Sequence, residues 1–445
     1  MNQTDDLIIL HARWIIPVEP AGQVLEGHAL VIRGGRIEAL LPSDQARAEY
    51  PTAAARELDR HALIPGLINA HTHAAMSLLR GYADDIPLMP WLEEHIWPAE
   101  RRWVNEDFVR DGTRLAMAEM IRGGVTCFND MYFFPDVTAR EVIRAGMRCG
   151  MGLIVLDAPT AWAKDADEYI AKGLAVHDEF GGHPLIQSVF APHAPYTVSD
   201  ESLIRLRTLS EELDLSIHMH VQETRLEVRL ATRENGERPL ARLDRLGLLT
   251  PRLMAVHMAH INDLEVRRMG ETGVNVVHCP ESNMKLGGER CPADSLRRAG
   301  VNVALGTDGA ASNNDLNLLG EMRSAALVAK SVVEDAEAMP AGAALRAATL
   351  GGAQALGLGG ETGSLEPGKA ADITAIDLDH IETQPVYDPV SMIVYAAGRH
   401  QISDVWVAGK SLLRDHKLVT LDSRAIRDTA KAWGERIGAE RHATS

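Results

Sequence analysis

The feature that most constrains the fold of this chain is a regular alternation of short apolar segments and helical patterns between residues 62 and 350. About eight βα units over roughly 290 residues match the size of a closed (β/α)8 barrel of the TIM type. A doubly wound sheet is the alternative, but no GxGxxG sequence follows an early strand. The expected strands cover 63–69, 125–128, 152–156, 185–190, 216–220, 253–257, 275–278 and 301–305.

Both ends of the chain have the composition of a small β domain. Two short strands flank Gly34-Gly35, a pair that favours a tight hairpin, and residues 371–377 and 402–407 are again rich in β-branched side chains. We therefore expect one β domain that is built from both termini. The expected division is a β-sandwich domain formed by 1–61 and 362–424, a barrel over 62–361, and a C-terminal helix and tail over 425–445.

Composition excludes several classes of protein. The 445 residues include 45 Lys and Arg against 62 Asp and Glu, a formal net charge of −17, which disfavours binding to nucleic acids and anionic membranes. The first residues, Met-Asn-Gln-Thr-Asp-Asp, lack the positive charge of a secretory signal, and no apolar run has the roughly 20 residues of a membrane helix. Four cysteines without a CxxC pair indicate a cytoplasmic protein without disulfides.

Histidines and an aspartate gather at the carboxyl ends of the expected strands. In a barrel these ends converge on one face, where active sites lie. His71 and His73 point to the same side of their strand because side chains alternate with a period of two. Two such imidazoles, a third histidine and a carboxylate predict a divalent-metal site with room for a water molecule. The strand-end residues are His71, His73, His193, His220, His257, His278 and Asp308, of which we expect His278 to be a core residue.

Five motifs occur in a fixed order along the chain. They are IPGLINAHTH at 64–73, HMHVQE at 218–223, SNMKL at 282–286, GTDG at 306–309 and GKAAD at 368–372. In this order they resemble the signature of the amidohydrolase superfamily, over nearly the whole chain. The resemblance is strongest to the family of 5-methylthioadenosine/S-adenosylhomocysteine deaminases, a branch that borders the triazine chlorohydrolases.

The resemblance implies a metal-binding role for four of these residues. His71, His73, His220 and Asp308 match the metal ligands of the superfamily. Members with two metals use a bridging lysine from the fourth strand, and residues 185–190 contain none, so we expect one divalent ion. Zinc is the expected ion, although Fe²⁺ and Mn²⁺ suit the same nitrogen and oxygen ligands.

The resemblance also implies roles for four residues toward the substrate. Glu223 matches the glutamate of the HxxE motif, which handles the ring nitrogen and the leaving amine. His257 matches the histidine beside the attacking water. Glu100 resembles the acceptor of the ribose hydroxyls, and His193 resembles a histidine that contacts the purine.

These roles define an expected reaction. A divalent metal lowers the pKa of a bound water toward about 7. Asp308 then accepts the proton of that water, His257 orients the water, and Glu223 protonates N1 of the adenine ring and later the amine. We expect hydrolytic deamination of an adenine nucleoside, above all 5′-methylthioadenosine to 5′-methylthioinosine and ammonia, with S-adenosylhomocysteine and adenosine as further substrates.

Two other functions stay open from the sequence. The same barrel can act on an amine or halide of another heteroaromatic ring, such as guanine, cytosine or a triazine. Glu100 distinguishes this alternative from deamination of an adenine nucleoside, because a partner for the ribose is useful only for nucleosides. The second possibility is an inactive metal-binding barrel or scaffold, which would not need Glu223, His257 and Asp308 together.

The residues around the expected substrate tail favour a neutral group. Between residues 150 and 190 the only Lys or Arg side chains are Lys164 and Lys172, and Trp162 lies in the same segment. A carboxylate tail would need a cation there, so the segment favours the methylthio group. The family resemblance further implies a homo-oligomer.

Overall fold

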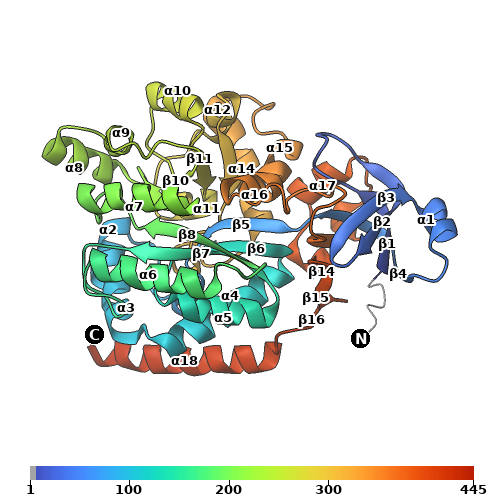
Figure 1. Ribbon diagram of the computed structural model, residues 1–445, viewed down its shortest axis with the longest axis horizontal. Coiled ribbons are helices and arrows are strands. Elements are labelled where there is room, and N and C mark those ends of the chain that lie inside the picture. The colour runs from blue at the N-terminus through green and yellow to red at the C-terminus, as the bar shows by residue number, and fades with distance from the viewer. Residues whose placement is uncertain (1–6, 445) are drawn as a thin grey trace.

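The computed structural model describes residues 7–444, with side chains as far as residue 439. Figure 1 shows a large barrel with helices around it and a smaller sheet at one side. The N-terminal sequence that we expect not to be a signal falls on residues 1–6, outside the described residues. Within the described range, no helix combines the length and the apolar character needed to cross a membrane.

Eight parallel strands form the barrel, which confirms the expected fold class. Each strand is hydrogen-bonded to the next along the chain, as expected when βα units follow one another. The expected bounds of 253–257 and 275–278 are those of two of the strands. The strands are β5 (Leu67–Thr72), β6 (Val125–Asp130), β7 (Arg148–Val155), β8 (Ile186–Pro192), β9 (Ser216–Val221), β10 (Leu253–His257), β11 (Asn275–His278) and β12 (Asn302–Leu305).

Helices connect the strands and cover the outside of the barrel (Figure 1). Several begin at a residue whose side chain accepts a backbone N–H of the first turn, which stabilises the helix start. Asn105, Asp165, Ser199 and Asn262 have this role. The helices include α4 (Glu106–Arg122), α5 (Pro135–Ala145), α6 (Ala166–Phe180), α7 (Asp200–Leu213), α8 (Arg225–Asn235), α9 (Pro239–Arg245), α10 (Asp263–Thr272), α11 (Pro280–Lys285), α12 (Ala293–Arg298), α13 (Ala310–Asn313), α14 (Leu318–Val333), α15 (Ala341–Arg346), η3 (Ala347–Gly351) and α16 (Gly352–Ala355).

The terminal sheet contains strands from both ends of the chain. Eight strands form one mixed sheet in the order β16-β15-β14-β13-β4-β1-β2-β3. The expected hairpin at Gly34-Gly35 is confirmed, since Arg33 pairs with Arg36 and both glycines have positive φ angles. The strands are β1 (Leu7–Ile15), β2 (Leu25–Arg33), β3 (Arg36–Pro42), β4 (Ala54–Pro65), β13 (Ile373–Asp377), β14 (Ile402–Val407), β15 (Lys410–Arg414) and β16 (Lys417–Leu418), with helix α1 (Ser43–Glu49) beside them.

The two sheets meet at Gly66, so the single strand expected over 63–69 is wrong. β4 stays in the terminal sheet through Pro65, which pairs with Ile373, and the barrel strand β5 begins at Leu67. A Cβ atom at Gly66 would lie 2.1 Å from the Thr126 hydroxyl oxygen, so only glycine fits at the position where the chain leaves one sheet and enters the other. The unbroken apolar run hides the break, because the strands on both sides of it are buried.

Between β12 and β5 the described barrel has no backbone ladder, and side chains join the two strands instead. The Asn69 amide donates to the Thr307 hydroxyl at 2.7 Å, and the Thr307 N–H donates to the Asn69 amide oxygen at 3.0 Å. Just beyond this pair, the Asp308 N–H donates to the carbonyl of His71 at 3.1 Å. These bonds fix the ends of the two strands relative to each other.

The C-terminal helix α18 (Ser423–Thr444) lies along one side of the barrel (Figure 1). Its Trp433 is buried, donates to an Asp111 carboxylate oxygen at 3.0 Å, and packs edge-on against Phe108 with ring centroids 5.4 Å apart. The same apolar cluster includes residues of the long segment after β5. That segment consists of η1 (Ala74–Leu79), α2 (Leu88–Pro90), η2 (Trp91–Ile96) and α3 (Trp97–Trp103).

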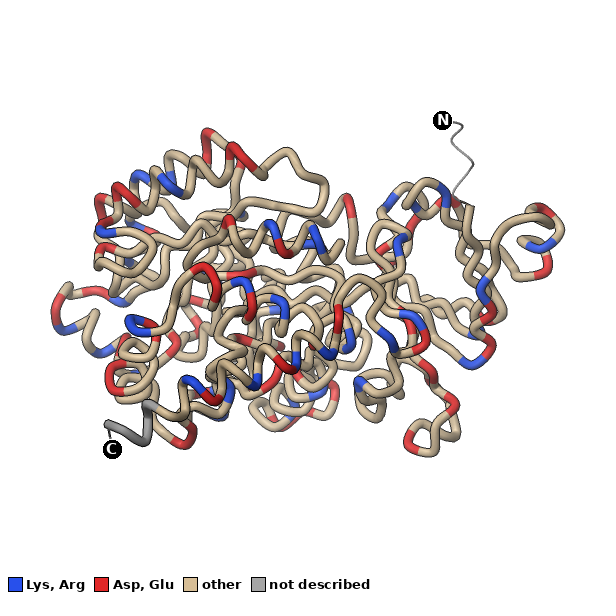
Figure 2. The backbone as a smooth tube through the Cα atoms, turned by 90° about the horizontal axis from the view of Figure 1, so that it is seen from below, with Lys and Arg blue, Asp and Glu red and all other residues tan. Residues whose placement is uncertain are grey.

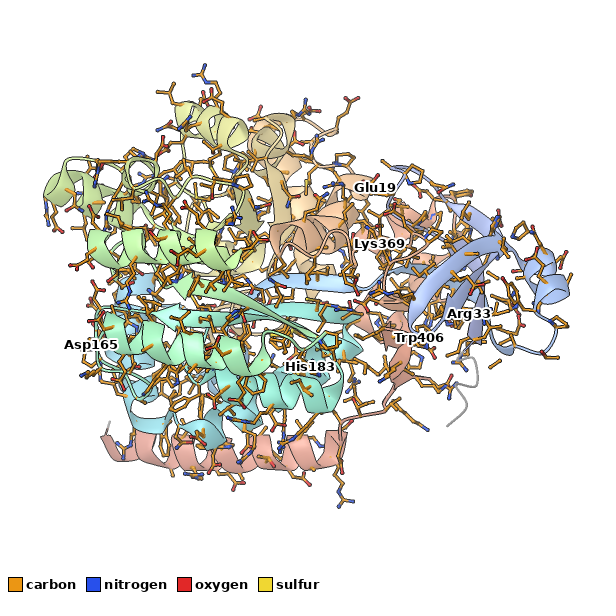
Figure 3. All side chains as sticks on the ribbon, in the orientation of Figure 1. Glu19, Arg33, Asp165, His183, Lys369 and Trp406 are labelled. Atoms are coloured by element: carbon orange, nitrogen blue, oxygen red, sulfur yellow. The ribbon has the colours of Figure 1, made fainter. Side chains whose placement is uncertain are left out.

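Charged residues occur on both the barrel and the terminal sheet, and each of the two has a core of buried apolar side chains. Figure 2 shows acidic and basic residues interspersed along the barrel and the terminal sheet. Figure 3 shows side chains filling the space between the elements, with Trp406 of β14 in the terminal sheet. This tryptophan is 5% exposed and belongs to the core of that sheet.

Candidate active site

The strand-end residues come together at one cavity of about 310 Å³, within the size range of small-molecule sites. The residues that line it include His73, Glu100, His193, His220, Glu223, His257 and Asp308. His71 is fully buried beside them, and its ring centroid lies 4.8 Å from that of His73. His278 is buried in β11, as expected for a core residue, and burial lowers its pKa to about 3.

Four side chains turn ligand atoms toward one another at the bottom of this cavity. The Nε2 atoms of His71 and His220 are 3.2 Å apart. The Asp308 Oδ1 atom is 3.3 Å from His71 Nε2 and 3.2 Å from His73 Nε2. Three imidazoles and one carboxylate in this arrangement fit the donor set of a divalent ion such as zinc.

Hydrogen bonds from the Nδ1 atoms of two rings turn their Nε2 atoms toward the cluster. The Nδ1 of His73 donates to the carbonyl of Met131 at 2.6 Å, and the Nδ1 of His220 donates to the carbonyl of His193 at 2.8 Å. A neutral imidazole that donates through Nδ1 presents an unprotonated Nε2, the form that binds a metal. Burial lowers the pKa of His71 to about 4, so this ring is neutral at pH 7. Burial also acts to lower the pKa of His73, but the Asp308 carboxylate outweighs it and raises this pKa to about 9, so binding of a metal ion would release a proton from His73.

Two serines orient the Asp308 carboxylate. Its Oδ2 accepts hydrogen bonds from Ser282 at 2.6 Å and from Ser312 at 2.8 Å, while Oδ1 faces the histidines. The Asp308 backbone has a φ of 63°, a left-handed conformation that few residues other than glycine adopt. Local strain of this kind persists where the surrounding contacts enforce it, often at functional sites.

Glu223 and His257 lie beside the four ligand-type residues. The Oε1 atom of Glu223 is 3.7 Å from Nε2 of His257, whose Nδ1 donates to the Asn283 amide oxygen at 2.8 Å. Burial raises the pKa of Glu223, so its protonated form is more favoured than in an exposed glutamate. The pair therefore offers a proton donor and an oriented imidazole next to the candidate metal position.

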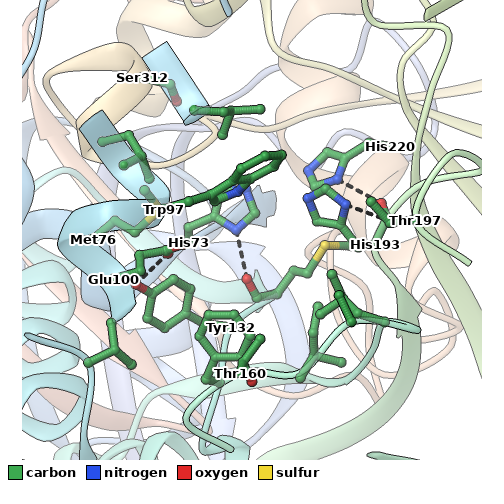
Figure 4. Close-up of a pocket in the computed structure, with 18 of the residues that line it drawn as sticks. His73, Met76, Trp97, Glu100, Tyr132, Thr160, His193, Thr197, His220 and Ser312 are labelled. Carbon is green, nitrogen blue, oxygen red and sulfur yellow. Dashed lines mark hydrogen bonds between the residues drawn. The ribbon is translucent and has the colours of Figure 1, made fainter. Parts of the chain in front are cut away.

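Glu100 and His193 lie on opposite sides of the cavity in Figure 4. Tyr132 donates a hydrogen bond of 2.8 Å to Glu100, and burial raises the pKa of this glutamate to about 7. The Nδ1 of His193 donates to the Thr197 hydroxyl at 3.0 Å, and burial lowers the pKa of His193 to about 3. The neutral His193 ring thus keeps Nε2 as an acceptor.

The structure places the side chains of Trp162 and Lys172, which were considered near the substrate tail, outside the cavity lining. Trp162 packs on Tyr169, with ring centroids 5.6 Å apart, and the carbonyl of Trp162 accepts from Lys172, so neither side chain lines the cavity. Arg101, next to Glu100 on α3, is a cation among the lining residues, and the sequence reasoning missed it. The segment 150–190 contributes Ile154, Leu156 and residues 158–161 to the lining and no cation, in line with the expectation from the sequence.

Apolar side chains form most of the remaining cavity wall. The long segment after β5 provides many of them, and other strand ends complete the wall. Tyr132, which holds Glu100, was also missed from the sequence, because it follows β6 and no motif marks it. Apolar lining residues include Met76, Trp91, Leu92, Ile96, Ile154 and Leu156.

Comparison with known proteins agrees with the fold. The chain belongs to the amidohydrolase family, whose family model matches residues 62–412.

Its relatives include proteins named 5-methylthioadenosine/S-adenosylhomocysteine deaminase. One from Teredinibacter turnerae is 48% identical over 97% of this chain and 98% of its own length. Another from Saccharophagus degradans is 46% identical over 99% of each chain. The crystal structure of an adenosine deaminase from Xanthomonas campestris with bound zinc is 50% identical, covers 97% of this chain and 98% of its own, and superposes with a TM-score of 0.96.

Proposed function

We propose that this protein is a metal-dependent hydrolytic deaminase of adenine nucleosides, which converts 5′-methylthioadenosine and water to 5′-methylthioinosine and ammonia. The observation that carries the proposal is the position of Glu223 and His257 beside the cluster of His71, His73 and Asp308, in a cavity that Glu100 also lines. The names of the relatives with 46% and 48% identity support the same activity, with S-adenosylhomocysteine as a second substrate.

We propose one zinc ion, held by His71, His73, His220 and Asp308. The three imidazoles and the carboxylate supply four ligand atoms, and the related adenosine deaminase of 50% identity carries zinc. When bound, the ion supplies an activated water for attack on the ring. Fe²⁺ and Mn²⁺ remain compatible with the same ligands.

Asp308, His257 and Glu223 divide the handling of protons. The Asp308 carboxylate, oriented by its two serines, accepts one proton of the attacking water. His257, fixed through Asn283, orients that water toward C6 of the adenine ring. Protonated Glu223 gives its proton to N1 as the C–O bond forms. Ionised Glu223 then takes the proton of the new C6 hydroxyl and passes it to the amine as the C6–N bond breaks, so the amine leaves as ammonia. Asp308 releases the proton that it took from water, and Glu223 is protonated again for the next turnover.

Glu100 and the apolar wall recognise the rest of the nucleoside. The Glu100 carboxylate uses one acceptor position on Tyr132 and has others for the ribose hydroxyls. His193 contacts the purine through its free Nε2. The apolar wall suits the neutral methylthio group. For S-adenosylhomocysteine, Arg101 is the lining cation that pairs with the carboxylate of the tail.

The test is ammonia release from a panel of possible substrates before and after chelation. The panel holds 5′-methylthioadenosine, S-adenosylhomocysteine, adenosine, guanine and cytosine. We expect the highest kcat/KM with 5′-methylthioadenosine, loss of activity after chelation and recovery with zinc. Activity on guanine or cytosine without any adenine nucleoside would contradict the proposal. The homo-oligomeric state and the cytoplasmic location stay predictions.

A further inference from the structure

A second group of ligand-type side chains lies on the terminal sheet, away from the cavity. β13 ends at Asp377 and the antiparallel strand β14 begins at Ile402, which pairs with Ile376. The turn that follows β13 and the turn that precedes β14 therefore lie side by side at one end of the sheet. These turns are η4 (Ile381–Thr383) and η5 (Arg399–Gln401), and helix α17 (Pro389–Tyr395) lies between them in the sequence.

Each turn brings metal-binding side chains to the same point. His380 and Glu382 come from the first turn and His400 from the second, and their ligand atoms all lie within 4.8 Å of one another. The two imidazole centroids are 5.8 Å apart with their planes at 78°. This edge-on arrangement resembles that of His71 and His73 in the active-site cluster, where the planes meet at 84°.

Buried hydrogen bonds hold the two turns together. The Gln401 side chain donates to the carbonyl of Asp377 at 2.9 Å and to the Thr383 hydroxyl at 3.2 Å. Thr383 in turn donates to the carbonyl of Leu378 at 2.8 Å, and both Gln401 and Thr383 are fully buried. The backbone under the ligand side chains is thus fixed in advance, which lowers the entropy cost of binding an ion.

Neighbouring groups also constrain the two histidines. A Cβ atom on Gly398 would lie 2.9 Å from Nδ1 of His400, so this ring packs directly on the glycine. His380 Nε2 is 3.9 Å from the Asp377 carboxylate, a residue that Arg60 also contacts at 3.0 Å. At this distance the carboxylate attracts a cation near His380 electrostatically but does not hydrogen-bond to the ring. Arg60 contacts the same Oδ2 oxygen of Asp377 and compensates part of its negative charge.

We propose that His380, Glu382 and His400 form a second metal site, specific for a divalent transition ion of the zinc type. Two imidazoles and a carboxylate match the preference of such ions and do not suit Ca²⁺ or Mg²⁺. His400 and Glu382 are exposed, so water completes the coordination. The bound ion joins the two turns on either side of α17 and is independent of the active-site ion.

The test is titration of the zinc-loaded holoenzyme with Zn²⁺ by calorimetry, with metal content checked by elemental analysis. The wild type is expected to bind one further equivalent and to gain thermal stability with it. His380→Asn and His400→Asn are expected to lose this equivalent, or to bind it about tenfold or more weakly, while kcat/KM stays unchanged. Mg²⁺ is expected to produce no binding signal.

Two further variants make the result specific to the geometry. Gly398→Ala keeps all three ligands but displaces the His400 ring, and its φ of −120° allows alanine, so weaker zinc binding is expected. His28→Asn, in β2 of the same sheet, is the matched control and is expected to behave as the wild type. An unchanged second equivalent in His400→Asn, or no second equivalent in the wild type, would overturn the proposal.

Discussion

Replacement of Glu100 by glutamine tests how the pocket recognises a nucleoside. Glutamine has nearly the same shape as glutamate and keeps one oxygen that can accept the hydrogen bond from Tyr132. The change removes the negative charge and replaces the second acceptor oxygen with a donor. Because Glu100 is only partly exposed and lines the cavity, the substitution is expected to weaken its hydrogen bonds to the ribose hydroxyls.

The size of the effect follows from the strength of these bonds. A hydrogen bond to a charged group contributes about 1.5 to 3 kcal/mol, and about 1.4 kcal/mol changes a rate ratio tenfold. The kcat/KM for 5′-methylthioadenosine is therefore expected to fall about 10- to 150-fold in the Glu100→Gln variant. Any turnover of free adenine, which has no ribose, is expected to change by less than about twofold.

The same substitution changes the pH dependence. Burial raises the pKa of Glu100 to about 7, so its carboxylate is ionised above this pH and protonated below it. In the wild type, the ratio of kcat/KM for 5′-methylthioadenosine to that for adenine is expected to fall as the pH drops through 7. Groups that act on both substrates cancel in this ratio. The Glu100→Gln variant is expected to give a ratio independent of pH.

The assay is ammonia release by a coupled enzyme between pH 6 and 8, with the exposed Glu94→Gln as the matched control on the same segment. The control is expected to behave as the wild type with both substrates. If Glu100→Gln lost activity on adenine and on the nucleoside to the same extent, Glu100 would not be the ribose partner. Unchanged kcat/KM for the nucleoside would refute the reasoning as well.

Three other substitutions test the chemistry, the metal position and the packing. Glu223→Gln is expected to lower kcat about 10²- to 10⁴-fold, the usual contribution of an acid–base group, with zinc content unchanged by elemental analysis. Thr307→Val leaves the buried Asn69 amide without its partner, so a loss of about 1 to 3 kcal/mol in unfolding free energy and faster zinc loss to a chelator are expected. Trp433→Ala is expected to cost about 3 to 5 kcal/mol in denaturant unfolding, because this side chain fills the cluster between α18 and α4. Wild-type zinc retention in Thr307→Val, or an unchanged unfolding midpoint in Trp433→Ala, would contradict the corresponding role.

The barrel and the gathering of the site residues follow from local signals in the sequence. Short apolar strands such as 253–257 are recognisable because helices with strong capping residues separate them. His71 and His73 lie two residues apart on one strand, so they share a face whatever the rest of the fold does. The carboxyl ends of parallel strands then bring distant residues such as Asp308 to the same place.

Contacts between distant segments were not predictable in this way. The start of β7 at Arg148, four residues before the expected start, is hidden by Gly150 and Gly152, which have low strand propensity. They are required there because a Cβ at Gly152 would lie 2.1 Å from the carbonyl of Asp130. The hydrogen bond from Tyr132 to Glu100 joins residues 32 positions apart, and no periodic pattern marks such a pair.

The position of Arg101 was missed for a related reason. The pocket wall near Glu100 is made by a long irregular segment after β5 rather than by a strand end. Its path depends on packing against Trp433 and other residues of the same apolar cluster. The sequence therefore predicted which strand-end side chains come together and missed part of the cavity wall that this segment forms.

The most direct test of the proposed function is ammonia release from 5′-methylthioadenosine by one protein sample in three states: as purified, after chelation and dialysis, and after addition of one equivalent of Zn²⁺. We expect high activity as purified, loss of activity after chelation, and recovery with zinc, together with 5′-methylthioinosine in an amount equal to the ammonia. Activity that survives complete removal of the metal, or zinc-loaded protein that releases no ammonia from 5′-methylthioadenosine, would contradict the account.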